Sequence, residues 1–243
     1  MFASREQRVG AAGAVDVAFT DRFDGVSAPP LDALDLGRGS PDEVSANFAL
    51  LAQCFGVAGF ARMRQTHSAK AVLVSGPTAE GSSPECDGLV TTEPDVALCV
   101  RAADCVPVVL ADTARGVVGV AHAGRLGVAA GIVDATVTCM RSAGAGRIEA
   151  WIGPHICGGC YEVPRQMRAE VAAVVPVAFA CTTWGTPSLD LGAAVHAQLV
   201  GAGCEVTSRA VCTRESPSLY SYRRDGADAG RSAGLVVLRA RGA

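Results

Sequence analysis

The stretch Ala102–Gly127 constrains the fold of this chain more than any other. Two short apolar runs, Val108–Leu110 and Val117–Ala121, are separated by a polar turn. Such a pattern predicts a hairpin or two neighbouring buried strands. Because Cys105 precedes the first run and His122 follows the second, their side chains are expected to meet at one end of this hairpin. A thiolate beside an imidazole indicates a zinc site or a Cys/His catalytic pair.

Length and composition narrow the class of protein. The 243 residues are 49% hydrophobic with a formal net charge of -3, which fits one large globular domain or two small ones. No stretch gathers the basic and aromatic residues of a nucleic-acid surface, and no apolar run reaches the roughly 18 residues of a membrane span. Residues 1–13 lack the apolar core of a signal peptide and are expected to be flexible, so a cytoplasmic protein is expected.

As candidate metal ligands or catalytic residues, histidines are more informative than cysteines here, because the chain has only four histidines against ten cysteines. Most of the cysteines are expected to be reduced core residues, since a long chain without an export signal has little use for disulfides. His67 lies between two expected strands, Gly59–Gln65 and Lys70–Val74. Its position in a strand-turn-strand junction makes it a candidate functional residue, although an ordinary turn histidine is an equal alternative.

Cys157 and Cys160 form a C-x-x-C pair after an expected strand. A zinc ribbon requires a second such pair at a suitable spacing, and the sequence contains none. One pair alone is a weak signal for redox chemistry or structural zinc, so the pair is not assigned a function from the sequence.

Three arginine-bearing turns are candidate anion-binding sites. Arg22 follows the expected strand Val15–Thr20, and Arg125 lies in the turn that opens the helix expected after the hairpin. The N-terminus of a helix attracts anions such as phosphate. Tyr222 and Arg223 lie in a C-terminal turn whose charge and aromatic rings suit a phosphate, a ribose or a base. An ordinary surface turn is the alternative in all three places.

Short motifs follow one another along nearly the whole chain. They are Phe19–Arg22 with Gly25–Ser27, Gln65–His67, Asp87–Thr91, Ala103–Pro107, Gly119–Gly124, Ile152–Pro154 with Cys160–Val163, and Tyr220–Asp225 with Gly230–Arg231. In content and order they resemble the motifs of the laccase-domain family. Members of that family are also called multicopper polyphenol oxidases, peptidoglycan editing factors and zinc-dependent purine nucleoside phosphorylases.

The resemblance implies an α/β fold in which residues 1–243 form a single-domain, multilayer α-β-β-α sandwich with mixed sheets. It implies that His67, Cys105 and His122 are the metal ligands. The implied activity is phosphorolysis of adenosine, inosine, guanosine and methylthioadenosine, together with adenosine deamination. The expected partners are therefore a purine nucleoside and phosphate, and the expected assembly is a monomer or small homo-oligomer.

One turn departs from the family pattern. After the second ligand histidine the family usually has Ala-Gly-Trp-Arg-Gly, whereas this chain has Ala123–Gly127, with the order Ala-Gly-Arg-Leu-Gly. The tryptophan is missing and the arginine, Arg125, has moved by one place. All three metal ligands remain, so the departure concerns substrate affinity more than the chemistry.

Two histidines and a thiolate leave a fourth position open, as catalytic zinc sites do. Zinc lowers the pKa of bound water toward about 7, or it orients an oxygen of phosphate or substrate. Asp87 is expected to orient a ligand histidine or to handle a proton, and Arg22, Arg125, Tyr222 and Arg223 are the candidates for binding substrate. Copper is disfavoured, because a multicopper oxidase needs about ten imidazoles for its copper centres and this chain has only four histidines.

Two further hypotheses remain open at the level of sequence. In the first, Cys105 is a nucleophile and His122 its base, in a hydrolase or editing factor that acts on peptidoglycan precursors without metal. In the second, the protein binds a ligand and its zinc is only structural. A nucleobase deaminase of the usual zinc type is disfavoured, because neither H-x-E nor P-C-x-x-C occurs.

Overall fold

The central hairpin is present in the computed structural model, which describes residues 1–78 and 82–240. Strand β7 (Val106–Asp112) pairs antiparallel with β8 (Val117–Ala123), and Pro107 lies opposite His122. Every residue of both strands is buried. A strand covered on both faces has no reason to alternate polar and apolar residues, which explains the two unbroken apolar runs.

The hairpin is the middle of a six-stranded mixed sheet with the order β12-β9-β7-β8-β5-β4. The two outer pairs, β12 with β9 and β4 with β5, are parallel, and the inner pairs are antiparallel. The other strands of this sheet are β4 (Ala71–Leu73), β5 (Gly88–Thr91), β9 (Glu149–Ile152) and β12 (Glu205–Ser208).

A second, five-stranded sheet has the order β1-β2-β13-β6-β3. It consists of β1 (Phe2–Gly10), β2 (Gly13–Thr20), β3 (Phe60–Ala61), β6 (Ala97–Ala102) and β13 (Ser232–Arg239). Its first strand corrects the expectation that residues 1–13 are flexible, because β1 pairs antiparallel with β2. The exposed residues of β1 alternate with partly buried ones, as in an edge strand with one face toward solvent. Such a strand has a polar composition, and this composition suggested a flexible terminus.

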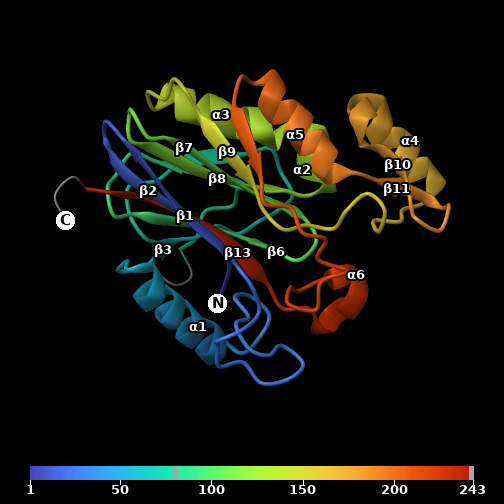
Figure 1. Ribbon diagram of the computed structural model, residues 1–243, viewed down its shortest axis with the longest axis horizontal. Coiled ribbons are helices and arrows are strands. Elements are labelled where there is room, and N and C mark those ends of the chain that lie inside the picture. Colours follow the sequence, from blue (N-terminus) through green and yellow to red (C-terminus); the bar gives the residue numbers. More distant parts are fainter. Residues whose placement is uncertain (79–81, 241–243) are drawn as a thin grey trace.

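The two sheets lie face to face between helices (Figure 1). The apolar layer between them contains Val17, Phe19, Val109, Val120 and Trp151. Helix α1 (Pro41–Phe55) covers the outer face of the five-stranded sheet, and α2 (Arg125–Ala130), α3 (Ile132–Ser142) and α5 (Leu191–Gly201) cover the other sheet. The α-β-β-α sandwich with mixed sheets expected from the resemblance is therefore confirmed.

The helix boundaries follow local chemistry. Ser40 and Glu43 form the capping box of α1, and Gly56 ends that helix in a left-handed conformation with φ 73°. The single helix expected after the hairpin is two helices, α2 and α3, because Gly131 between them has φ 89°. Strand β11 (Pro187–Leu189) immediately precedes α5, whose capping residue Asp190 accepts a hydrogen bond from the Ala193 N–H.

The remaining elements are short. They are α4 (Arg165–Val174), the 3-10 turns Pro176–Ala178 and Gly226–Asp228, β10 (Phe179–Cys181), which pairs with β11, and α6 (Tyr222–Asp225).

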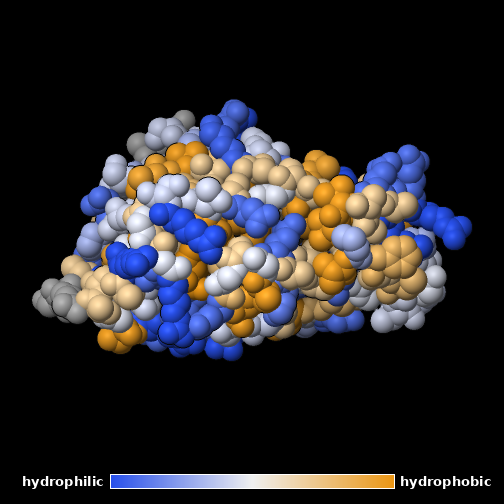
Figure 2. Space-filling view, turned by 90° about the horizontal axis from the view of Figure 1, so that it is seen from above, coloured by the Kyte–Doolittle hydropathy of each residue, from blue (hydrophilic) through white to orange (hydrophobic). Residues whose placement is uncertain are grey.

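Figure 2 looks down on the helical layer, where hydrophobic and hydrophilic residues are interspersed. No helix within residues 1–78 and 82–240 is long and apolar enough to cross a membrane.

Candidate metal centre

His67, Cys105 and His122 meet at one end of the central hairpin. One potential ligand atom from each lies within 4.8 Å of the others. The Cys105 Sγ is 4.0 Å from His67 Nε2, and the two imidazole rings meet edge to face with centroids 4.9 Å apart. These three residues, called the pocket centre below, form a metal-capable site of two nitrogens and one sulfur.

The backbone around the pocket centre is held in an uncommon conformation. His67 has φ 60° and Asp104, the residue before Cys105, has φ 86°. Non-glycine residues avoid this left-handed region, which costs of order 1–3 kcal/mol and persists only where surrounding contacts enforce it. His67 lies in the turn between β3 and β4, and Cys105 immediately precedes β7. The three ligands thus come from separate segments that the sheet brings together.

Asp87 is the contact that enforces the His67 turn. Its fully buried carboxylate accepts hydrogen bonds from the backbone N–H groups of Thr66 (3.0 Å), His67 (3.0 Å) and Ser68 (2.7 Å). The same carboxylate lies 2.8 Å from His122 Nδ1, which directs Nε2 of that ring toward the cluster. Burial raises the pKa of Asp87, but the hydrogen bonds from His122, Ser68 and Thr66 outweigh it and hold the pKa well below its usual range.

The pocket centre favours a thiolate. Burial raises the pKa of Cys105, but the hydrogen bonds and positive charge of His122 and His67 outweigh burial and lower the pKa to about 6. Burial lowers the pKa of His122, whereas Asp87 and Cys105 raise it more, to about 9. Since the thiolate is the form that binds metal or attacks an electrophile, Cys105 is prepared for either role.

The space beside the ligands suits a metal ion. A Cβ added at Gly124 would lie 2.6 Å from the His67 ring and 3.1 Å from Cys105 Sγ. Gly124 has an extended conformation with φ -77°, so the backbone itself does not require glycine there. The absence of a side chain keeps the ligand atoms free, and the donor set of two imidazoles and one thiolate is one that zinc prefers.

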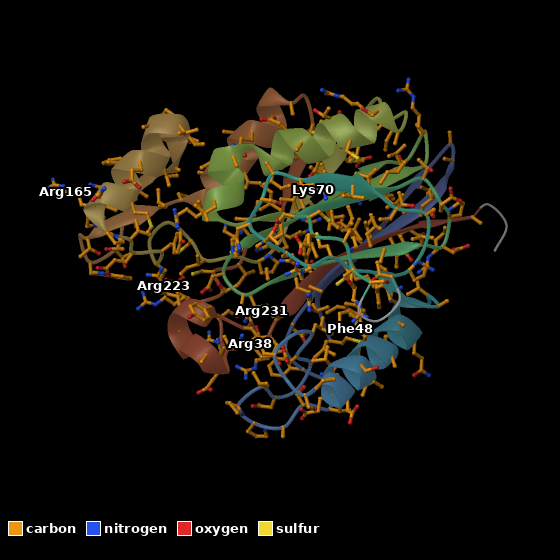
Figure 3. All side chains as sticks on the ribbon, turned by 180° about the vertical axis from the view of Figure 1, so that it is seen from behind. Arg38, Phe48, Lys70, Arg165, Arg223 and Arg231 are labelled. Carbon is orange, nitrogen blue, oxygen red and sulfur yellow. The ribbon has the colours of Figure 1, made fainter. Side chains whose placement is uncertain are left out.

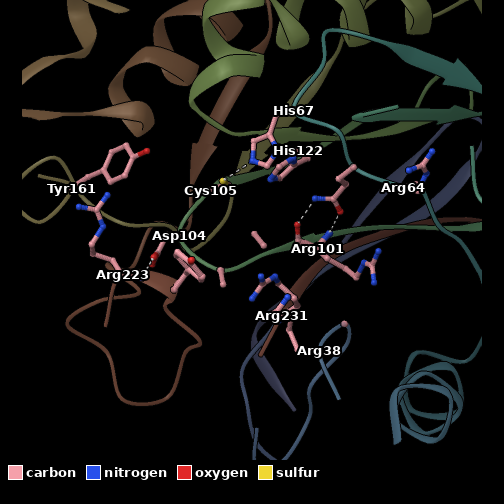
Figure 4. Close-up of a pocket in the computed structure, with 15 residues that line it drawn as sticks. Arg38, Arg64, His67, Arg101, Asp104, Cys105, His122, Tyr161, Arg223 and Arg231 are labelled. Carbon is pink, nitrogen blue, oxygen red and sulfur yellow. Dashed lines mark hydrogen bonds between the residues drawn. The ribbon is translucent and has the colours of Figure 1, made fainter. Parts of the chain in front are cut away.

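The pocket centre opens into a cavity of about 590 Å³. Figure 4 shows His67, Cys105 and His122 at one end of it, with Arg38, Arg101 and Arg231 at the other. Figure 3 places Arg38 and Arg231 close together below the sheets, with Arg223 on the neighbouring α6 side. A volume of this size is in the range of small-molecule sites.

The three arginines at the far end of the cavity form a cationic wall. Within residues 1–78 and 82–240, none of Arg38, Arg101 and Arg231 forms an ion pair; their side chains donate only to backbone carbonyls. Burial, and then the nearby positive charge of Arg38, lower the pKa of Arg231. Guanidinium groups without carboxylate partners recognise phosphate well.

A second wall consists of Tyr161, Tyr222 and Arg223. The Arg223 guanidinium lies 4.9 Å from the centre of the Tyr161 ring. Its backbone N–H donates to the Asp104 carboxylate at 2.6 Å, which ties this wall to the residue next to Cys105. Aromatic rings beside a guanidinium provide stacking surface for a flat heterocycle.

The structure brings together only part of the predicted substrate-binding set. Tyr222 and Arg223 line the cavity, whereas Arg22 and Arg125 are not among its lining residues. Arg22 instead donates to the Asp32 carbonyl at 2.8 Å and lies over the Tyr220 ring. Burial raises the pKa of Tyr161 and the nearby Arg125 partly offsets this, so Arg125 lies close to a cavity residue without lining the cavity itself. Helix α2, which Arg125 opens, has only six residues, so its dipole is a weak source of positive charge.

Several cavity residues were not predicted as site residues from the sequence. Gln65 exchanges two hydrogen bonds with the backbone of Arg101, at 2.8 and 3.0 Å. Gln65, Tyr161 and Arg231 lie inside motifs noted in the sequence, so those motifs contained a usable signal. The sequence contains no such signal for Arg38 and Arg101, because a single arginine in a loop or strand looks the same whether it faces solvent or a cavity.

Fold and site together define a class: α/β sandwich proteins with one open His-Cys-His centre beneath a cationic cavity. Residues 16–239 match the family described as multi-copper polyphenol oxidoreductase laccase. The chain belongs to this family.

Proteins with assigned names are similar over most of the chain. A purine nucleoside phosphorylase of Streptomyces coelicolor is 50% identical over 228 residues, which are 90% of this chain and 94% of the relative. A protein named adenosine deaminase, from an unknown prokaryotic organism, is 34% identical over 186 residues, 70% of this chain and 71% of the relative. The crystal structure of a Neisseria meningitidis protein has a TM-score of 0.84 at 31% identity, covering 98% of this chain and 99% of that one.

Proposed function

We propose that this protein is a purine nucleoside phosphorylase that joins phosphate to the ribose of adenosine, inosine, guanosine or methylthioadenosine and releases the purine base. The observation that supports it best is that the pocket centre lies in one cavity with three arginines whose side chains form no ion pair within the described residues. The name of the similar Streptomyces coelicolor protein, purine nucleoside phosphorylase, supports the coarser part of the proposal, a purine nucleoside and phosphate as substrates.

The reaction replaces one bond at the ribose. An oxygen of phosphate bonds to C1′ of the sugar while the bond from C1′ to N9 of the purine breaks, and its electron pair leaves with the base. Arg38, Arg101 and Arg231 are suited to bind the phosphate dianion, because each guanidinium offers several N–H donors in a fixed plane. Tyr161, Tyr222 and Arg223 are suited to hold the base by stacking.

His67, Cys105 and His122 would hold a zinc ion in this proposal. The ion, when bound, supplies a Lewis acid that orients an oxygen of phosphate or substrate, or lowers the pKa of water. Asp87 fixes the orientation of His122 and the shape of the His67 turn, so it acts as a positioning residue. The cavity walls hold the nucleoside and phosphate against the pocket centre, and close positioning of two reactants lowers the barrier between them.

Deamination of adenosine is the second candidate activity, because the 34% identical relative is named adenosine deaminase. A single experiment separates the two reactions. The purified protein is incubated with a panel of purine nucleosides, with and without phosphate, and the products are separated by chromatography. Free base that appears only with phosphate supports phosphorolysis, whereas phosphate-independent inosine from adenosine supports deamination. No product from any nucleoside would refute both.

The metal-free hydrolase or peptidoglycan editing hypothesis has one supporting observation, the thiolate form of Cys105 beside His122. Removal of metal with a chelator tests it. Nucleoside cleavage that stops after chelation and returns with zinc supports the phosphorylase. Cleavage of a peptide, amide or ester that continues unchanged in the chelated protein supports Cys105 as a nucleophile.

A further inference from the structure

A second group of metal-capable side chains lies outside the pocket centre. Cys157, Cys160, Cys212 and Glu215 each offer one ligand atom, and the four atoms lie within 4.8 Å of one another. This group is called the knuckle cluster below. It shares no residue with the pocket centre or with the residues that line the cavity.

Two tight turns present these four side chains in pairs. In the first turn the N–H groups of Cys160 and Tyr161 both donate to the Cys157 carbonyl at 3.0 Å. In the second the N–H of Ser216 donates to the Cys212 carbonyl, also at 3.0 Å. Each turn carries two ligands three residues apart, as C-x-x-C and C-x-x-E. Paired turns of this kind are how zinc ribbons hold their ion.

The second pair explains why the sequence did not reveal this site. A search for a partner of Cys157 and Cys160 looks for another C-x-x-C and finds none, because the fourth member is a carboxylate. Glutamate is an accepted zinc ligand, but a lone C-x-x-E is too common to be recognised as a motif. Only the fold shows that Cys212 and Glu215 face the first pair.

The two turns are already in contact in a way that suits a shared ion. The Cys157 N–H donates to Cys212 Sγ at 3.5 Å, and Cys160 Sγ lies 3.3 Å from Glu215 Oε1. An isolated parallel β-bridge between the backbones of His155 and Cys212 fixes the register of the two segments. All ten cysteines are free thiols, so no disulfide accounts for the clustering.

We propose that the knuckle cluster binds one Zn²⁺ ion as a structural site, with Cys157, Cys160, Cys212 and Glu215 as its four ligands. Three thiolates favour a soft ion over magnesium or calcium. Tetrahedral zinc with bonds of about 2.3 Å separates its sulfur ligands by about 3.8 Å, so the side chains need to move only slightly from their present positions. Four protein ligands leave no open position, which makes the site structural.

The position of the knuckle cluster indicates which segments a bound ion would stabilise. Cys160 precedes Tyr161, which lines the cavity, and Cys212 precedes Thr213, whose hydroxyl donates to Asp104 at 2.6 Å. An ion shared by the two turns would fix both segments, and with them the wall of the cavity beside Cys105. The inference does not depend on which reaction the cavity supports.

Metal content of the purified full-length protein tests the proposal. After reconstitution with zinc and removal of excess, elemental analysis is expected to give two zinc ions per chain. Cys212→Ser and Cys157→Ser are each expected to retain one, the ion of the pocket centre. Cys54→Ser, which changes an exposed cysteine elsewhere, is the matched control and is expected to retain two.

Two results would overturn the proposal. One is a single zinc ion per chain that Cys105→Ser removes and Cys212→Ser does not affect. The other is an intact mass about 2 Da low before reduction, with a disulfide mapped between two of the three cysteines. If the cysteine variants fail to fold, Glu215→Gln decides the question, because it keeps all three thiols. Release of the second zinc to a chelator about tenfold faster than in wild type supports the site, and unchanged release contradicts it.

Discussion

The pocket centre and the knuckle cluster use similar atoms in opposite surroundings. The pocket centre has three potential ligands, opens into the cavity and relies on Asp87 to orient its turn and one of its rings. The knuckle cluster has four potential ligands on two tight turns and does not line the cavity. An open position suits an ion that meets substrate, whereas a closed set suits an ion that holds chain segments together. Under both proposals, ligand number and access separate an ion that takes part in chemistry from an ion that stabilises the fold, within one domain.

The largest expected effect is on turnover when the pocket centre is broken. His67→Ala, Cys105→Ser and His122→Ala are each expected to lower phosphate-dependent release of base by about 1,000-fold or more. The reason is that a bound metal ion stabilises the transition state by several kcal/mol. The measurement is steady-state turnover with inosine or adenosine. Wild-type-like turnover in any one of the three would remove that residue from the proposed centre.

A smaller loss is expected when the support of the pocket centre is weakened. Asp87→Asn keeps the size of the side chain but replaces one acceptor oxygen by an NH₂ donor that cannot accept from the Ser68 and Thr66 groups. Zinc affinity at the pocket centre is expected to fall about 10- to 100-fold. Competition with a chromophoric chelator measures it. If the affinity is unchanged, Asp87 has no part in setting the metal geometry.

The cationic wall is expected to have a moderate effect that is specific to phosphate. Arg38→Met removes a guanidinium whose only hydrogen bond within the described residues is to the Ala227 carbonyl, at 3.5 Å. We expect the KM for phosphate to rise about tenfold, since a hydrogen bond between charged groups contributes roughly 1.5–3 kcal/mol. Arg147→Met, at an exposed pair with Glu205, is the matched control. An equal rise in the control, or a rise only in the KM for nucleoside, would contradict the assignment.

Breaking the knuckle cluster is expected to affect stability more than chemistry. Cys157→Ser should lower the melting temperature of the zinc-loaded protein by several degrees, as about 2–4 °C accompanies each kcal/mol in a domain of this size. Turnover below the melting temperature should stay within about tenfold of wild type. A loss of turnover as large as that in His122→Ala, with the fold intact by circular dichroism, would end the distinction between the two clusters.

The smallest effect concerns the pH at which Cys105 reacts. In chelated protein its pKa is lowered to about 6, so the thiolate persists as the pH falls until it is protonated near that value. Alkylation of the Cys105 peptide by iodoacetamide should therefore decline with a midpoint near pH 6, whereas a free thiol declines near about pH 8.5. Mass spectrometry of the peptide follows the rate. A midpoint of pH 8 or above would show that His67 and His122 do not stabilise the thiolate.

The sequence predicted the central part of the fold because its signals were local. The two apolar runs around the turn at residues 112–116 became β7 and β8. The flexible N-terminus was a wrong expectation, since edge strand β1 has polar residues on a face that meets water. The helix break at Gly131 was also missed, because glycine inside a helical pattern often leaves the helix intact.

What the sequence determined by itself was the pairing of Cys105 with His122, because their separation is set by a hairpin with a short turn. The resemblance to a known family added His67, and the structure places it within the same cluster. Only the tertiary structure decided that Arg38, Arg101 and Arg231 share a cavity with them, and that Cys212 and Glu215 face Cys157 and Cys160. Those contacts join residues far apart in the chain, and their geometry depends on how two sheets and their loops pack. Local patterns carry no information about such packing, so it emerges only when the whole domain is folded.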